Sequence, residues 1–168
     1  MFNLARTFAP LLSLCLPLAA CAREADKPEP KPFRTVGIPD REHGYDNLKS
    51  AVIRTKADFE ALLTSVADQG AWNNKKAFTD ALKGANIDFD KEALVLLRHT
   101  EGSGSVQVTF EVPGFKDGTI TCSITRKEPP VGTADMAYYC FALAVSKADV
   151  KEVVLKVGEK ETAKLKVQ

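Results

Sequence analysis

The apolar residues of this chain change their spacing near Asn86. Before that point they recur three and four residues apart, as in a helix that buries one side. After it many of them alternate with polar residues, as in a strand that buries one face. Residues 93–98 differ from both patterns, because they are almost entirely apolar, which is typical of a central strand covered on both faces. The chain therefore predicts helices followed by a sheet.

Two helices are expected ahead of the sheet. The first, residues 56–67, begins after Thr55, a good N-cap residue, and places large apolar side chains on one face: Phe59, Leu62, Leu63 and Val66. The second, residues 74–82, ends before Gly84, since glycine favours the end of a helix. Trp72 lies between the two helices, and we interpret it as part of the core rather than as a platform for a ligand.

Strand patterns fill most of the remaining domain. Two short ones, residues 35–38 and 50–54, precede the helices. The others follow the helices: residues 93–98, 105–112, 119–126, 136–145, 152–157 and 162–167. These elements predict an α+β fold, in which two N-terminal helices pack on one face of an antiparallel sheet of five to six strands. The predicted domain is single and covers residues 34–168.

Residues 1–20 have the three parts of a secretory signal. Arg6 is their only charged residue, an apolar run follows it, and small residues stand before Cys21. The apolar run is too short to cross a bilayer, which requires about 20 residues. Residues 18–21, with the sequence Leu-Ala-Ala-Cys, resemble the lipobox of bacterial lipoproteins.

The lipobox resemblance implies that cleavage removes residues 1–20 and that Cys21 carries acyl chains such as palmitate, which anchor the chain to a membrane. Ala22 takes the place of the aspartate that favours the inner membrane. The resemblance therefore implies the outer membrane, with the domain facing the periplasm or the cell surface. The alternative is an ordinary signal peptide cut after Ala20, which would leave a soluble protein. Residues 21–33 are charged and rich in proline, and we interpret them as an extended tether.

The four cysteines divide by position. Cys15 leaves with the signal and Cys21 takes the lipid, so Cys122 and Cys140 remain in the domain. An even pair in an oxidising compartment predicts a disulfide. Two alternatives are a pair of buried free thiols and a redox pair, although redox cysteines are usually two residues apart, as in C-x-x-C.

The charge balance excludes some classes of partner. The chain has 23 Lys and Arg and 22 Asp and Glu, and loss of Arg6 with the signal leaves 22 of each, a formal side-chain charge of zero. Because nucleic-acid binding needs a basic surface, no nucleic-acid partner is expected. His43 and His99 are the only histidines, and neither stands in a metal-binding or catalytic spacing. We therefore expect no metal, no cofactor and no enzyme activity.

Several short motifs stand in a fixed order between residue 50 and the end of the chain. They are an Ile-Asp-Phe-Asp-Lys entry into an apolar strand, a glycine turn, a Pro-Val-Gly connector and an aromatic strand: residues 87–91, 93–97, 102–104, 130–132, Tyr138 and Tyr139. In this order they resemble the C-terminal domain of the PrcB family of protease-complex subunits. The resemblance implies a secreted or lipid-anchored α+β domain without an active site. Such a domain binds or stabilises a protein partner, with a protease as one candidate.

Two loops are the candidates for partner binding, since loops carry many binding contacts. They are the glycine turn and the connector, with the residues Gly102, Ser103, Gly104, Pro129, Pro130, Val131 and Gly132. An alternative function is that of a protease inhibitor, in which residues 128–135 enter a protease cleft as a rigid extended loop. A third is that of a small-ligand carrier, which would need an apolar pocket.

The lipid anchor leads to a direct prediction. The substitution Cys21→Ala removes the acylated thiol, so the protein should move from the membrane fraction to the soluble fraction and should lose incorporation of labelled palmitate. Cell fractionation followed by immunoblotting measures the change, and a Cys15→Ala variant serves as the control that keeps the anchor. If Cys21→Ala leaves both fractionation and signal cleavage unchanged, the anchor is not at Cys21.

Overall fold

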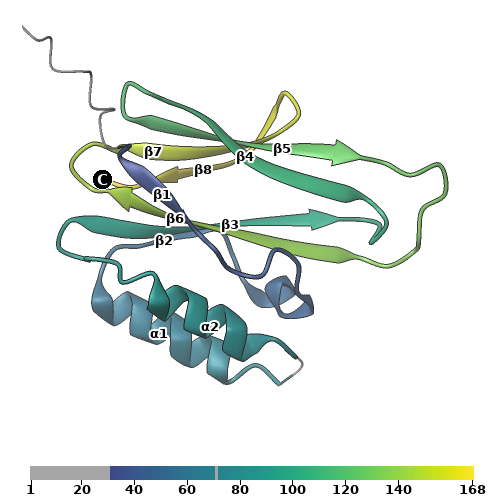
Figure 1. Ribbon diagram of the computed structural model, residues 1–168, viewed down its shortest axis with the longest axis horizontal. Helices are drawn as coiled ribbons and strands as arrows, with labels where there is room; N and C mark the ends of the chain where they lie inside the picture. Colours follow the sequence, from purple (N-terminus) through teal and green to yellow (C-terminus); the bar gives the residue numbers. More distant parts are fainter. Residues whose placement is uncertain (1–30, 71) are drawn as a thin grey trace, which may run out of the picture. The chain divides into compact units, whose positions relative to one another are not determined.

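The computed structural model describes residues 31–70 and 72–168. Within these residues, eight strands and two α-helices form three layers: a helical layer, a four-stranded sheet and a second four-stranded sheet (Figure 1). Residues 31–168 form a compact unit by themselves. Residues 1–30, which contain the expected signal, Cys21 and most of the tether, lie outside the described part.

The first sheet is the middle layer and is antiparallel throughout. Its strands, in spatial order, are β1 (Phe33–Val36), β6 (Ala137–Ser146), β3 (Glu92–Glu101) and β2 (Ala51–Ile53). β3 and β6 pair along ten residues. Both strands are buried on both faces: Val95 and Leu97 face the second sheet, whereas Leu94 and Leu96 face the helices.

The second sheet consists of two hairpins placed side by side. Its strands, in spatial order, are β4 (Gln107–Lys116), β5 (Thr119–Lys127), β7 (Glu152–Val157) and β8 (Lys160–Lys166). β5 and β7 are parallel. The chain connects them through β6, which follows β5 in the sequence but belongs to the first sheet and runs back in the opposite direction. The sheet buries Ile120, Ile124 and Leu155 against the first sheet.

The helices α1 (Lys56–Ala67) and α2 (Lys75–Gly84) cover the other face of the first sheet. α1 has the predicted bounds, and Asp58 N–H donates to the Thr55 side chain at its N-cap (3.1 Å). Trp72 is 4% exposed and packs against Phe78 of α2 with ring centroids 4.9 Å apart. Its assignment to the core is confirmed. A short 3-10 helix, η1 (His43–Asn47), completes this cluster.

The predicted fold class is wrong, although most strand positions are correct. Helices on one face of a single sheet would leave the other faces of β3 and β6 in water, including Val95 and Leu143, which are fully buried. A second sheet covers these side chains instead. Phe33, which the sequence analysis placed in the tether, is the first residue of β1.

The predicted disulfide is also wrong, because its two cysteines lie in different sheets. Cys122 of β5 faces the core between the sheets, whereas Cys140 of β6 faces the helices. β5 pairs with β4 and β7, so Cys122 and Cys140 are not cross-strand neighbours. Both cysteines are free and buried. Burial raises the pKa of each thiol to about 12, with a small opposing effect of Arg98 on Cys140.

The thiols provide a test of the two-sheet arrangement. In a form that begins at Ala22, Cys122 and Cys140 are the only cysteines. Neither should react with iodoacetamide in the native protein, because both are buried and protonated. Both should react after unfolding in guanidinium without a reductant, and intact-mass spectrometry should count two adducts. If the unfolded protein gains no adducts until a reductant is added, the two cysteines form a disulfide after all.

Candidate functional site

The two candidate loops meet at one end of the sheets. The glycine turn follows β3, and the connector joins β5 to β6. Gly104 N–H donates to both the carbonyl oxygen (2.8 Å) and Oδ1 (3.1 Å) of Asp135. Arg41 Nη1 donates to the Gly104 carbonyl oxygen (2.8 Å), and Arg41 Nη2 lies 3.5 Å from Asp135 Oδ2. Hydrogen bonds from Thr133 and from the Gly104 backbone lower the pKa of Asp135.

Serine and threonine side chains add a second set of contacts between the loops. Thr133 N–H donates to Ser103 Oγ (3.0 Å) and to Ser105 Oγ (3.1 Å). A Cβ atom on Gly104 would lie 2.1 Å from Asp135 Oδ2, so a larger residue there would displace the Asp135 side chain from its present contacts. These contacts fix the connector against the glycine turn.

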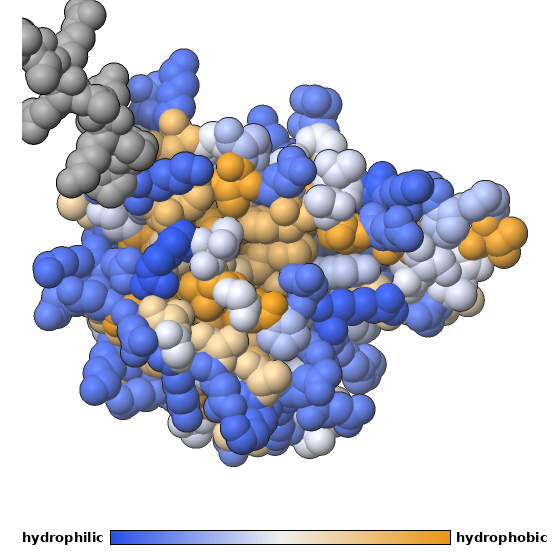
Figure 2. Space-filling view, in the orientation of Figure 1, coloured by the Kyte–Doolittle hydropathy of each residue, from blue (hydrophilic) through white to orange (hydrophobic). Residues whose placement is uncertain are grey.

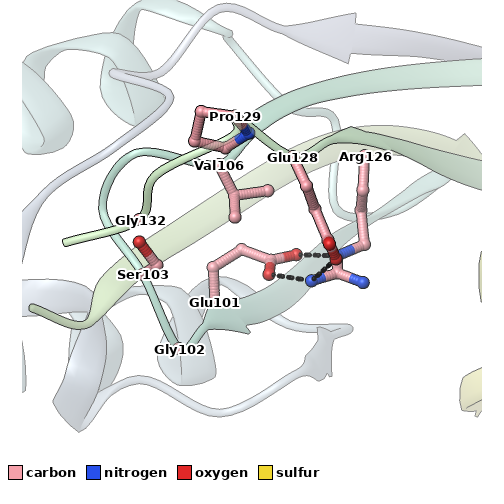
Figure 3. Close-up of a pocket in the computed structure, with 8 residues that line it drawn as sticks. All are labelled: Glu101, Gly102, Ser103, Val106, Arg126, Glu128, Pro129 and Gly132. Carbon is pink, nitrogen blue, oxygen red and sulfur yellow. Dashed lines mark hydrogen bonds and ion pairs between the residues drawn. The ribbon is translucent and has the colours of Figure 1, made fainter. Parts of the chain in front are cut away.

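A pocket with a volume of about 290 Å³ lies where the two loops leave their strands (Figure 3). Its lining includes Gly102, Ser103, Pro129 and Gly132 of the predicted residues, together with Glu101, Val106, Arg126 and Glu128. Gly104, Pro130 and Val131 do not line it. Val131 is instead 82% exposed, on the part of the connector beyond the pocket.

A buried carboxylate forms the base of the pocket. Glu101 is 3% exposed and accepts two hydrogen bonds from Arg126, from Nε to Oε1 (2.7 Å) and from Nη2 to Oε2 (2.8 Å) (Figure 3). His99 Nε2 lies 2.6 Å from Glu101 Oε1. Glu128 Oε1 lies 3.1 Å from Arg126 Nη2. Burial alone would raise the pKa of Glu101, but the hydrogen bonds and charges of Arg126 and His99 lower it.

Sequence analysis missed this ion pair, although the signal was present. In β3 the odd-numbered residues face the second sheet, and in β5 the even-numbered residues face the first. When this alternation is continued past Leu97 and Ile124, it reaches Glu101 and Arg126. Strand periodicity therefore predicts that Glu101 and Arg126 both face the core, whereas their meeting depends on how the two sheets pack.

The polar side chains of the site are engaged with one another. Ser103 is used in the contact with Thr133, and His99 in the contact with Glu101. In residues 31–70 and 72–168, no group of three or more His, Cys, Asp or Glu side chains is placed to hold a metal ion. None of the helices in these same ranges has the length and apolar character needed to cross a membrane. The loops present outward a connector that hydrogen bonds hold against the glycine turn, beside a pocket with an ion pair at its base.

Comparisons with protein families, with curated proteins and with solved structures found no match to this chain. The resemblance to the PrcB family therefore stays a prediction.

The buried ion pair gives a prediction for stability. Glu101→Gln keeps the shape of the side chain but removes its charge from Arg126, and it should lower the free energy of unfolding by about 1–3 kcal/mol. The lower part of that range is expected, because the Arg126 side chain is 39% exposed to water. Glu128→Gln is the matched control. Its side chain is 67% exposed, so its loss should change the free energy by less than about 0.5 kcal/mol.

The pH dependence of the stability difference between wild type and Glu101→Gln shows whether the charge of Glu101 causes that difference. Because the pKa of Glu101 is lower in the folded state, its carboxylate stabilises the fold above the unfolded-state pKa. This contribution is lost as the pH falls through the folded-state pKa. Urea unfolding of wild type and Glu101→Gln should therefore differ at about pH 7 and converge toward about pH 2. A difference that stays constant over this range would show that packing, and not charge, causes it.

Proposed function

We propose that this protein is a lipid-anchored accessory protein of the cell envelope. Its domain binds or stabilises a protein partner through the loop surface, which we define as residues 102–104 and 129–132. The observation that carries the proposal is the exposed Val131, on a connector that hydrogen bonds hold against the glycine turn. The anchor belongs to the proposal as well: Cys21 would hold the chain to the outer membrane, and residues 21–32 would be the tether.

The exposure of apolar side chains supports a protein partner. Three large apolar side chains of the described residues are exposed, and two of them, Val131 and Met136, lie in the connector. Surface apolar groups that gather in one segment are typical of contact sites with other proteins. The third, Phe115, lies near the β4–β5 turn.

The rigidity of the connector supports the same proposal. A loop that is ordered before binding loses less conformational entropy when it binds, so more of the contact free energy appears as affinity. Thr133 and Asp135 anchor the connector on its C-terminal side. Arg126, paired with Glu101, anchors it on its N-terminal side. Residues 129–132 between these anchors are free to meet a partner.

A protease is the partner class that the PrcB resemblance suggests, and inhibition is the alternative function. Pro129 and Pro130 have fixed φ angles, which favours an extended connector of the kind that protease clefts accept. The two functions separate in a simple assay. An inhibitor slows cleavage of a reporter peptide by its protease in proportion to occupancy, whereas an accessory subunit leaves that cleavage unchanged or accelerates it.

Photo-crosslinking in cells tests the loop surface. A photoreactive phenylalanine analogue in place of Val131 should give one discrete crosslinked band, and the same analogue at Thr162, an exposed residue of β8, should give none. A further change, Ser103→Ala with Ser105→Ala, should reduce the band several-fold, because it removes the two acceptors of Thr133 N–H. Equal bands at Val131 and Thr162, or none at Val131, would contradict the proposal.

A further inference from the structure

The space between the two sheets has two lateral edges, and side chains close these edges to different extents. On the side of β2 and β8, Arg54 donates from Nε to the Val167 carbonyl oxygen (2.9 Å) and from Nη2 to the Lys166 carbonyl oxygen (2.6 Å). Lys147 Nζ donates to the Arg54 carbonyl oxygen (2.7 Å) on the same side. These bonds join the end of the first sheet to the last strand of the second.

On the side of β1 and β4, a groove with a volume of about 220 Å³ lies between the sheets. Residues 35–38 border one side, with the Val36 and Ile38 side chains packed in the cluster under the helices, and Phe110 of β4 borders the other side. Phe141 of β6 lies on the floor, stacked on Phe110 with ring centroids 4.2 Å apart and planes inclined by 7°. Figure 2 shows an apolar area in the middle of this face, over the region of β1 and β4 in Figure 1.

The groove borders a strand edge that carries little protection against pairing. In the described part of the chain, β4 pairs with β5 alone, so its other edge has no strand beside it. Natural edge strands are usually protected by charge, proline or a bulge. β4 has such protection only in its second half, where Pro113 stands and the register shifts between Glu111 and Gly114. Between Gln107 and Glu111 the edge is regular and has one charged residue.

The opposite edge of the second sheet is protected along its length. β8 carries three lysines and a glutamate: Lys160, Glu161, Lys164 and Lys166. Charged side chains, lysine above all, discourage the addition of another strand. The first half of β4 is therefore the edge of this sheet that is suited to receive one.

The free edge continues directly from the loop surface. Val106 lines the pocket between the loops, and Phe110 lines the groove. Phe110 is four positions after Val106, or about 13 Å along an extended chain at about 3.3 Å per residue. A peptide that lay along β4 would thus begin beside the loop surface and place a side chain in the groove.

We propose that the protein partner supplies an extended segment that adds to the second sheet next to β4, with an apolar side chain in the groove beside Phe110 and Phe141. This inference rests on the proposed function, because the loop surface makes the neighbouring contact with the same partner. The backbone groups of residues 107–111 supply the hydrogen bonds, and alternate side chains of the segment face the groove. The chain's own tether is unsuited to the place, since residues 22–32 contain no large apolar side chain that could fill the groove.

A displayed library of random heptapeptides is the probe, and the chain from Ala22 onward is the target. The selected peptides should carry apolar residues at alternate positions. On binding, hydrogen exchange should slow in residues 107–111. A synthetic copy of a selected peptide, N-methylated at alternate amides on its pairing edge, should bind at least about tenfold more weakly, because several backbone hydrogen bonds are lost together. This change is in the peptide, so it does not depend on the folding of a protein variant.

Two matched protein variants locate the site. Phe110→Ala should weaken binding of the selected peptide at least about tenfold, because it removes a wall of the groove. Phe115→Ala makes the same change on the same strand, beyond the bulge, and should leave binding within about twofold. Thermal unfolding of both variants shows whether each remains folded.

Three results would overturn the inference. The selected peptides could bind wild type and a folded Phe110→Ala variant equally well. Hydrogen exchange could slow in β1 or β8 instead of β4, or N-methylation of the peptide could leave its affinity unchanged. A dimer in sedimentation whose formation slows exchange in residues 107–111 would also overturn it, since a second copy would then occupy the edge. Failure of the proposed function is distinct, because it appears as the absence of a specific crosslink at Val131 in cells, whatever the peptides do.

Discussion

The arrangement of layers depends on the pairing of β3 with β6. Their register runs from Glu92 opposite Ser146 to Glu101 opposite Ala137, and both strands carry apolar side chains on both faces. Neither face can be left in water, because each buried methylene contributes about 0.8 kcal/mol. One face is covered by α1 and α2 and the other by the second sheet. The two-sided apolar pair thus requires a layer on each side of the first sheet.

The same pairing determines where the loop surface forms. β3 ends in the glycine turn, and β6 begins at the end of the connector, so their alignment brings both loops to one end of the molecule. At that end the apolar row facing the second sheet gives way to Glu101, which meets Arg126. Removing one partner of a buried ion pair is costly, whereas the pair as a whole contributes little net stability. Its main effect here is to fix the strands from which the two loops depart.

Sequence patterns predicted the elements and their faces well, but not which strands are neighbours. The α1 bounds are as expected, and β6 divides into two faces as its alternation indicates, with Leu143 on one side and Cys140 on the other. Period-two alternation identifies the buried face of a strand, but it does not identify the strand's neighbours. The parallel pairing of β5 with β7 and the separation of Cys122 from Cys140 are such long-range features.

Alternation also contained information about the site that composition and motif spacing did not reveal. The glycine turn and the connector stood out by their turn residues, whereas Glu101, Arg126 and Asp135 were not named as site residues. Continuing the inward rows, from Leu97 through His99 to Glu101 in β3 and from Ile124 to Arg126 in β5, predicts that the acid and the base both face the core, but not that they meet. It would not have placed Asp135 or Arg41, because both lie outside the regular strands. A two-sided apolar strand that ends in a single acid is therefore a signal to seek a base on the facing sheet, and the loops that leave those two strands are the first place to look for a binding surface.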